Sequence, residues 1–281
     1  MPRTYRRRKL TDILVRSACV AAAVFALIPL GSVLYYVTSR GIGALNLDFF
    51  TELPKPVGES GGGMANAILG TLKLVFLACV LGIPPGVLAG VYLAEFGHSR
   101  FGQWVRFSAD VMSGVPSITV GIFVYSLVVL QTKQFSALAG GIALSVLMLP
   151  TVTRTTEELL KLVPESLREA ALGLGLSKWR ATLRVMLRTA APGIATGVML
   201  AVARVAGETA PLLFTAFSNR FYSSGLNEPT ASLPVSIYTY AVSPYEEWHR
   251  QAWAAALLLL LMVLILNISA RLLVQNRTGV R

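Results

Sequence analysis

Residues 252–268, which read AWAAALLLLLMVLILNI, contain no charged side chain over a length close to that of a bilayer's hydrocarbon core. An amphipathic helix of a soluble protein would carry charged residues along one face of such a stretch. The whole chain has the same apolar character, because 54% of its 281 residues are hydrophobic, only 14% are charged and the mean hydropathy is +0.62. The sequence therefore predicts an all-α integral membrane protein.

Five further apolar stretches predict, with this one, six transmembrane helices in a single domain of residues 1–281. The six expected spans are residues 17–37, 64–94, 108–130, 138–152, 192–216 and 251–274. The first is longer than the apolar region of a secretory signal, which runs to about 15 residues, so we interpret it as a retained span. The fourth is short, and we expect residues 153–156 to complete it.

The net charge of +11 fits membrane topology better than nucleic-acid binding, because no basic groove interleaved with aromatic residues is apparent. Basic residues gather at helix ends and in alternate loops. If the N-terminus is inside the cell, the basic residues of the outer segments are only Arg40, Lys55, Lys133, Arg220 and Arg250. Since Lys and Arg are retained on the cytoplasmic side, we expect a multi-pass protein of the bacterial plasma (inner) membrane with both termini in the cytoplasm.

The sequence offers little for catalysis, metal binding or a cofactor. Cys19 and Cys79 lie inside expected spans, and His98 and His249 are isolated from each other and from carboxylate clusters. No Gly-x4-Gly-Lys-Ser/Thr motif is present, so the chain itself is not expected to bind ATP. We therefore predict no catalytic residue, no metal site and no cofactor.

The expected cytoplasmic loop, residues 154–190, differs from the other connections. Leucine and alanine recur at helical spacing on both sides of Pro164, which predicts two short amphipathic helices. A loop of this length with helices of its own is long for a connector. We therefore expect it to bind a partner.

This loop contains Glu169, Ala170 and Ala171, followed by Gly175, and so resembles the EAA loop of ABC importer permeases. The resemblance implies that these residues form a coupling helix that docks in a groove of a cytoplasmic ATPase. Small side chains allow close approach, and a carboxylate near the helix start can pair with a basic group. The family pattern ends its loop with a proline that is missing after Leu187, so we expect Pro192 to end the loop instead.

Four further motifs narrow the resemblance to the phosphate-specific permeases, and to their A-type subunit more than to the C-type companion. The motifs are GGMANAILGTL at 62–72, GVPSI at 114–118 with Gly121, LPTVTRTTEE at 149–158 and GETAPLL at 207–213. The resemblance implies a type I ABC importer permease fold, a sister permease, two ATP-binding subunits, an extracytoplasmic phosphate-binding protein and phosphate as the substrate. ATP and Mg would then be used by the partner ATPase.

Arg204 is the charged residue that the expected fifth span accommodates at greatest cost. It lies about twelve residues after Pro192, or about 18 Å along a helix, and so near the bilayer midplane. A central arginine costs at least about 2.5–3.5 kcal/mol, so such residues normally face a bundle interior or a wet cavity. Glu208 is one turn further on and is expected to share a face with Arg204.

Two interpretations of these charges stay open. One is a structural ion pair that locks helices together. The other is a substrate pathway in which Arg204 contacts the transported anion and Glu208 positions Arg204, with Thr209 of the same motif beside them. Lys73 is interpreted as a cation whose long stem reaches a polar region, and Pro84, Pro85 and Pro116 as either kinks or breaks that line a cavity.

Two alternative functions are weighed against the same sequence features. Another ABC permease, for a different oxyanion or small solute, would keep the coupling loop and change the substrate. An ion-coupled secondary transporter would be expected to show repeats of opposite topology, and no convincing internal repeat is apparent.

The basic-residue distribution generates a test of topology. With Cys19 and Cys79 replaced, a cysteine at Ser99 should resist a membrane-impermeant thiol reagent in cells with an opened outer barrier, and one at Asn227 should react. The reverse labelling pattern would contradict the orientation.

Overall fold

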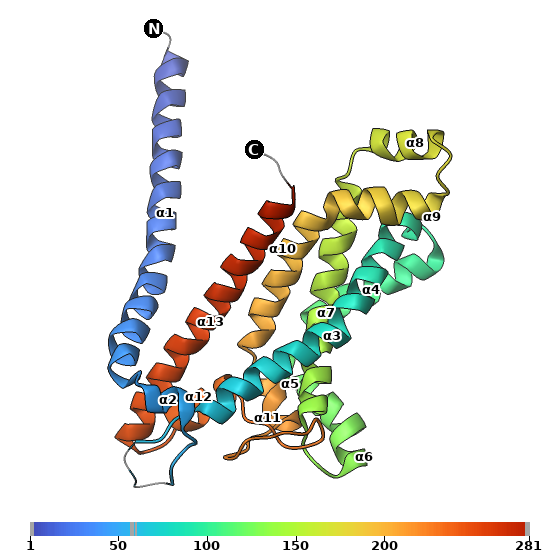
Figure 1. Ribbon diagram of the computed structural model, residues 1–281. Coiled ribbons are helices and arrows are strands. Elements are labelled where there is room, and N and C mark those ends of the chain that lie inside the picture. The colour runs from blue at the N-terminus through green and yellow to red at the C-terminus, as the bar shows by residue number, and fades with distance from the viewer. Residues whose placement is uncertain (1–2, 57–58, 60, 279–281) are drawn as a thin grey trace.

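The computed structural model describes residues 3–56, 59 and 61–278, and this part of the chain is mainly helical (Figure 1). Its elements are α1 (Arg3–Gly41), η1 (Ile42–Ala44), α2 (Leu47–Thr51), α3 (Ala65–Phe96), α4 (Arg100–Gly114), α5 (Ser117–Val124), η2 (Tyr125–Val129), α6 (Leu130–Thr132), α7 (Ala137–Lys161), α8 (Glu165–Gly173), α9 (Lys178–Ala181), η3 (Thr182–Met186), α10 (Leu187–Ala206), α11 (Ala210–Thr215), α12 (Leu233–Ala241) and α13 (Glu246–Thr278). Both η2 and η3 are π-helical turns inside longer helical runs.

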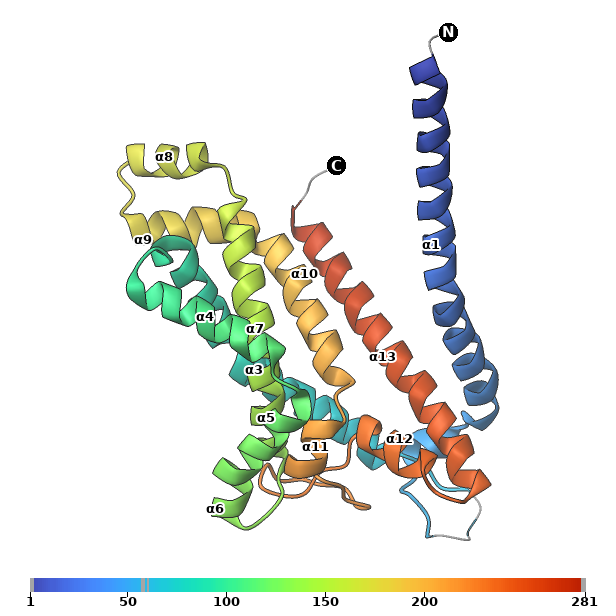
Figure 2. The ribbon, with the colours of Figure 1, turned by 180° about the vertical axis from the view of Figure 1, so that it is seen from behind.

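Five helices are long and apolar enough to cross a membrane, and a bent pair, α4 with α5, η2 and α6, brings the number to six. This agrees with the predicted fold class. The two views place α8 and α9 at one end of the bundle, together with the first turns of α1 and the last turns of α13 (Figures 1 and 2). The opposite end holds α2, α6, α11 and α12.

Helix α7 is the centre of the bundle, and 67% of its most apolar stretch of 18 residues is buried. Small residues four positions apart on α3 let the two helices approach closely. A β-carbon at Gly86 would lie 2.9 Å from Val152 Cβ, and one at Gly90 would lie 2.5 Å from Thr156 Cβ. Close approach through small residues is how membrane helices gain packing energy without a hydrophobic driving force between them. The α3–α7 contact therefore requires these glycines.

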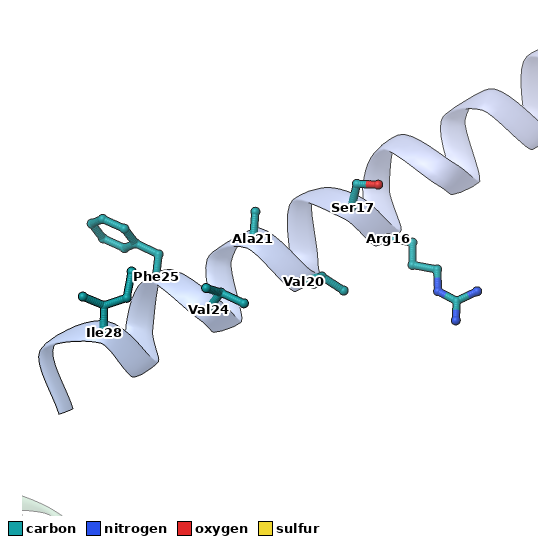
Figure 3. A pocket seen from close by; sticks show the side chains of 7 residues that line it. All are labelled: Arg16, Ser17, Val20, Ala21, Val24, Phe25 and Ile28. Carbon is teal, nitrogen blue, oxygen red and sulfur yellow. The ribbon is translucent and has the colours of Figure 1, made fainter. Parts of the chain in front are cut away.

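Among the described residues, helix α1 packs against the rest of the chain near its C-terminal end. A β-carbon at Gly41 would lie 2.8 Å from Leu257 Cβ of α13, and Figure 1 shows the two helices diverging from there. Along the free length of α1, the side chains of Val20, Val24 and Phe25 project from the helix, and each is more than half exposed (Figure 3). In a membrane, lipid or another subunit would cover this apolar face.

Two sequence-based expectations about the fifth span are wrong, and a question left open for the third span is decided. The third span is broken at Pro116, one of the two alternatives for that proline, because the chain bends by 107° between α4 and α5. The fifth span does not run over residues 192–216, since its helical run begins at Lys178 and ends at Ala206. Pro192 therefore lies inside α10 and does not end the cytoplasmic loop.

The loop expected to be cytoplasmic holds one separate amphipathic helix, α8, where two were expected. Residues 154–161 continue α7 to Lys161, as the predicted completion of the short fourth span required. Pro84 and Pro85 do not interrupt α3, which stays helical from Ala65 to Phe96. Among these prolines, only Pro116 marks a break, at the N-terminus of α5.

Candidate functional site

Arg204 lies in the last turn of α10, two residues before the helix ends at Ala206. Its side chain is exposed, on the same face as Thr196 and Leu200, which precede it by eight and four positions. A cation in the last turn is favoured by the partial negative charge at a helix C-terminus. The residue thus sits beside a helix break, not in the middle of an unbroken span.

Glu208 and Thr209 belong to that break. The Glu208 amide donates to the Val205 carbonyl at 3.2 Å, and the Thr209 carbonyl accepts from the amide of Leu212 at 3.1 Å, at the start of α11. Because α10 has ended, Glu208 does not continue the helical face of Arg204, and the expectation that the two share one is wrong. Within the described ranges, the side chains of Arg204, Glu208 and Thr209 form no hydrogen bond or ion pair.

A second break packs against the first. The GVPSI motif forms the bend between α4 and α5, and a β-carbon at Gly121 of α5 would lie 2.6 Å from Pro211 Cα of α11. The motifs at 114–121 and 207–213, far apart in the sequence, are therefore brought into contact. Irregular backbone at membrane depth is tolerated only where it is buried in protein or lines a water-filled cavity.

This arrangement can bind an anion. Arg204 offers a planar fork of donors that no group of the described chain occupies, and such a fork matches two oxygens of an oxyanion. The structural ion pair with Glu208 is not formed. Within the described residues, no group of three or more His, Cys, Asp or Glu side chains is placed to hold a metal ion.

Three of the residues expected to couple to an ATPase, Glu169, Ala170 and Ala171, lie on α8, at the opposite end of the bundle, and Gly175 follows this helix. Glu169 and Ala170 are exposed, whereas Ala171 is buried. Leu174, at the helix end, is 85% exposed, an unusual position for a large apolar side chain unless a partner covers it.

Gly175 ends α8 by a specific backbone geometry. Its φ is +81°, its amide donates to the Leu172 carbonyl at 2.9 Å, and the Leu176 amide donates to the Ala171 carbonyl at 3.2 Å. These are the two hydrogen bonds of a Schellman motif, in which glycine takes the left-handed position at no steric cost. A β-carbon at Gly175 would meet nothing within 4 Å, so the glycine is required for its φ angle and not for space.

An ion pair that the sequence did not indicate ties α8 to α3. Arg168 Nη1 donates to Glu95 Oε2 at 2.6 Å, and the Glu95 side chain is only 6% exposed. This hydrogen bond raises the pKa of Arg168 above the usual guanidinium value. Lys178 Nζ, at the start of α9, lies 3.8 Å from the same carboxylate. The sequence signal for this ion pair is the position of Glu95 at the end of a long apolar run.

A second ionic cluster clamps α4 to α7 on the same side. Glu157, 1% exposed, accepts hydrogen bonds from Arg106 of α4 and from Lys161 one turn away, each at 2.5 Å. Arg154 bridges Glu157 at 3.0 Å and Asp110 of α4 at 2.9 Å. A buried carboxylate requires such partners. The cluster fixes the end of α7 from which the chain continues into α8.

Lys73 anchors the opposite end of α3, as its interpretation as a cation reaching a polar region implied. Its ammonium donates to the carbonyls of Ser223 at 2.5 Å and Gly225 at 3.2 Å, in the connection between α11 and α12. Asn66 Nδ2 of α3 also donates to this connection, at the Asn219 carbonyl, over 2.6 Å. The connection that follows the GETAPLL motif is thus held on the first turns of α3.

Comparisons with known proteins agree with this geometry. Residues 86–278 match the family described as "Binding-protein-dependent transport system inner membrane component". The chain is 48% identical to the phosphate transport system permease protein PstA of Yersinia pestis, over 97% of this chain and 92% of that protein. It is 47% identical to the protein of the same name from Haemophilus influenzae, over 96% of each chain.

Solved structures show the same fold at low identity. A chain of a bacterial alginate ABC transporter, solved in complex with an alginate-bound periplasmic protein, superposes with a TM-score of 0.70. The match covers 99% of both chains at 15% identity, so it bears on the fold alone.

The Gly175 geometry generates a test of the coupling helix. Valine at this position should disrupt the end of α8, because a β-branched residue at φ +81° is strained by about 1–2 kcal/mol or more. We expect Gly175→Val to reduce the amount of ATPase that copurifies with the chain at an unchanged membrane level. Gly175→Asn is the matched control, since asparagine tolerates the left-handed region. Equal ATPase recovery with valine and with asparagine would contradict the role assigned to this turn.

Proposed function

The chain belongs to the family of binding-protein-dependent transport system inner membrane components, and from this membership we propose that it is the permease subunit of an ATP-driven importer of inorganic phosphate. The observation that carries the proposal is the near full-length identity of 48% and 47% to two phosphate transport permeases. Its six-span helical fold is that of type I ABC importer permeases. The chain is a membrane permease and not itself an enzyme.

The complex that we propose contains this chain, a sister permease, two ATP-binding subunits and an extracytoplasmic phosphate-binding protein. The exposed apolar face of α1 supports a second membrane subunit, as does the exposed Leu200, which shares the α10 face with Arg204. The exposed Glu169 and Leu174 of α8 support docking to a cytoplasmic ATPase, which would use the ATP and Mg. The end of the bundle that carries α8 and both terminal helix ends is then cytoplasmic.

We place the phosphate pathway beside the two helix breaks. Arg204 contacts the anion through its guanidinium, and Glu208 and Thr209 offer polar groups in the break that follows. Their freedom from internal hydrogen bonds and ion pairs supports this assignment over a structural pair. A site with one arginine and a nearby carboxylate favours an oxyanion that still carries a proton, because the carboxylate can accept a hydrogen bond from it.

Substitutions of Arg204 test the pathway. Arg204→Gln should lower phosphate uptake by about tenfold or more, since a lost charge-assisted hydrogen bond removes about 1.5–3 kcal/mol. Membrane level and subunit assembly should stay near normal, because no internal partner is left unpaired. Arg204→Lys should restore only part of the uptake, as lysine keeps the charge and loses the bidentate fork.

The matched control is Arg188→Gln, which makes the same change near the start of α10, where the side chain is also exposed. It should leave phosphate uptake nearly unchanged. Normal uptake in Arg204→Gln, or an equal loss in both variants, would rule out a specific role of Arg204 in the pathway.

A further inference from the structure

The inner end of α3 is bound to the coupling helix by a contact between distant parts of the chain. Glu95 lies in the last turn of α3 and accepts a 2.6 Å hydrogen bond from Arg168, the residue before Glu169 on α8. The Arg168 side chain is 19% exposed and that of Glu95 is 6% exposed, so water screens this pair far less than a surface pair. We refer to Glu95–Arg168 as the inner contact.

The outer end of α3 is bound to the connection between α11 and α12. Lys73 donates to the carbonyls of Ser223 and Gly225, and the hydroxyl of Thr71 accepts a hydrogen bond from the Leu233 amide at 2.8 Å. A β-carbon at Gly70 would lie 2.0 Å from the Ala231 carbonyl oxygen, so the connection also packs directly on the helix backbone. We refer to the hydrogen bonds of Lys73 as the outer contact.

The two contacts lie at opposite sides of the membrane on one continuous helix. Lys73 and Glu95 are 22 positions apart, or about 33 Å along an α-helix, which is close to the thickness of the hydrocarbon core. No charged residue occurs between them, and Pro84 and Pro85 do not break the helix. Both views show α3 extending from the neighbourhood of α12 to that of α9 (Figures 1 and 2).

We propose that α3 transmits movement between the coupling helix and the outer connection, with Glu95 and Arg168 as positioning residues at the inner end and Lys73 at the outer end. The proposal rests on the proposed function, because it concerns how ATP hydrolysis is coupled to uptake. A displacement of α8 reaches α3 through the inner contact. It then reaches residues 217–232, and with them α11 and the break at Glu208, through the outer contact.

Geometry favours α3 over the other routes between α8 and the break at Glu208. The covalent links of α8 to its neighbours are short non-helical stretches, residues 162–164 and 174–177, which bend more easily than a helix. Helix α10 leads toward the same break, but a π-helical turn at Thr182–Met186 lies between it and α9. Helix α3 is held at both ends by charged side chains and packed along its length on α7.

The test measures phosphate uptake per ATP hydrolysed by the complete complex in proteoliposomes, with the phosphate-loaded binding protein present. Glu95→Gln and Lys73→Met should each lower this ratio by about fivefold or more, within the usual range of coupling between sites, while ATP hydrolysis persists. Glu165→Gln is the control for the inner contact, because Glu165 is 3.5 Å from the same guanidinium but on α8 itself. Arg250→Met is the control for the outer contact, since the partner of Arg250 among the described residues is Glu247 of the same helix, α13.

A covalent replacement separates transmission from stability. In a chain without Cys19 and Cys79, Glu95→Cys with Arg168→Cys should be uncoupled, and a short bifunctional maleimide should restore the ratio. A monofunctional maleimide should not restore it. The comparison is made within one assembled sample, so it holds even if Glu95→Gln lowers protein level.

Each outcome decides a different claim. Restoration by the bifunctional reagent alone supports the proposal. An unchanged ratio in Glu95→Gln, or equal ratios with both reagents, would overturn it while the unaltered complex still takes up phosphate. Failure of the unaltered complex to take up phosphate would instead contradict the proposed function.

Discussion

The close contact of α3 with α7 is the interaction on which the rest of the bundle depends. Gly86 and Gly90 allow it, since a β-carbon at either position would collide with Val152 or Thr156. In lipid, helices associate through packing and hydrogen bonds and gain little from the hydrophobic effect, so the loss of close approach would not be offset elsewhere. With α7 fixed in the centre, α10 packs on it and α4 is clamped to it through Glu157. The break between α4 and α5 then meets the break between α10 and α11 beside α7.

Charge is distributed according to what each side of the membrane requires. On the α8 side, the Glu95 and Glu157 side chains are buried and paired with basic residues, which attaches α8 to α3 and α4 to α7. Beside the breaks, Arg204 and Glu208 are left without partners in the described chain, as a site that must bind and release an anion requires. Charged residues of the same types therefore serve structure on the α8 side and, in the proposed pathway, substrate binding beside the breaks.

The sequence predicted the fold class, six spans and an amphipathic helix after Pro164, because apolar length and helical spacing are local signals. It left open whether Pro116 marks a kink or a break, and it did not predict the end of α10 at Ala206, since apolar residues continue beyond that point in α11. Pro84 and Pro85 carry the same local signal as Pro116 and leave α3 intact, so only tertiary packing decides which proline interrupts a helix. The contact of Glu95 with Arg168 joins residues 73 positions apart, and no periodicity indicates such a pair.

The most direct measurement of the central claim is the anion dependence of ATP hydrolysis by the complete complex, reconstituted with its binding protein. The account predicts that phosphate stimulates hydrolysis and that sulfate at the same concentration does not. Equal stimulation by sulfate, or none by phosphate, would contradict it.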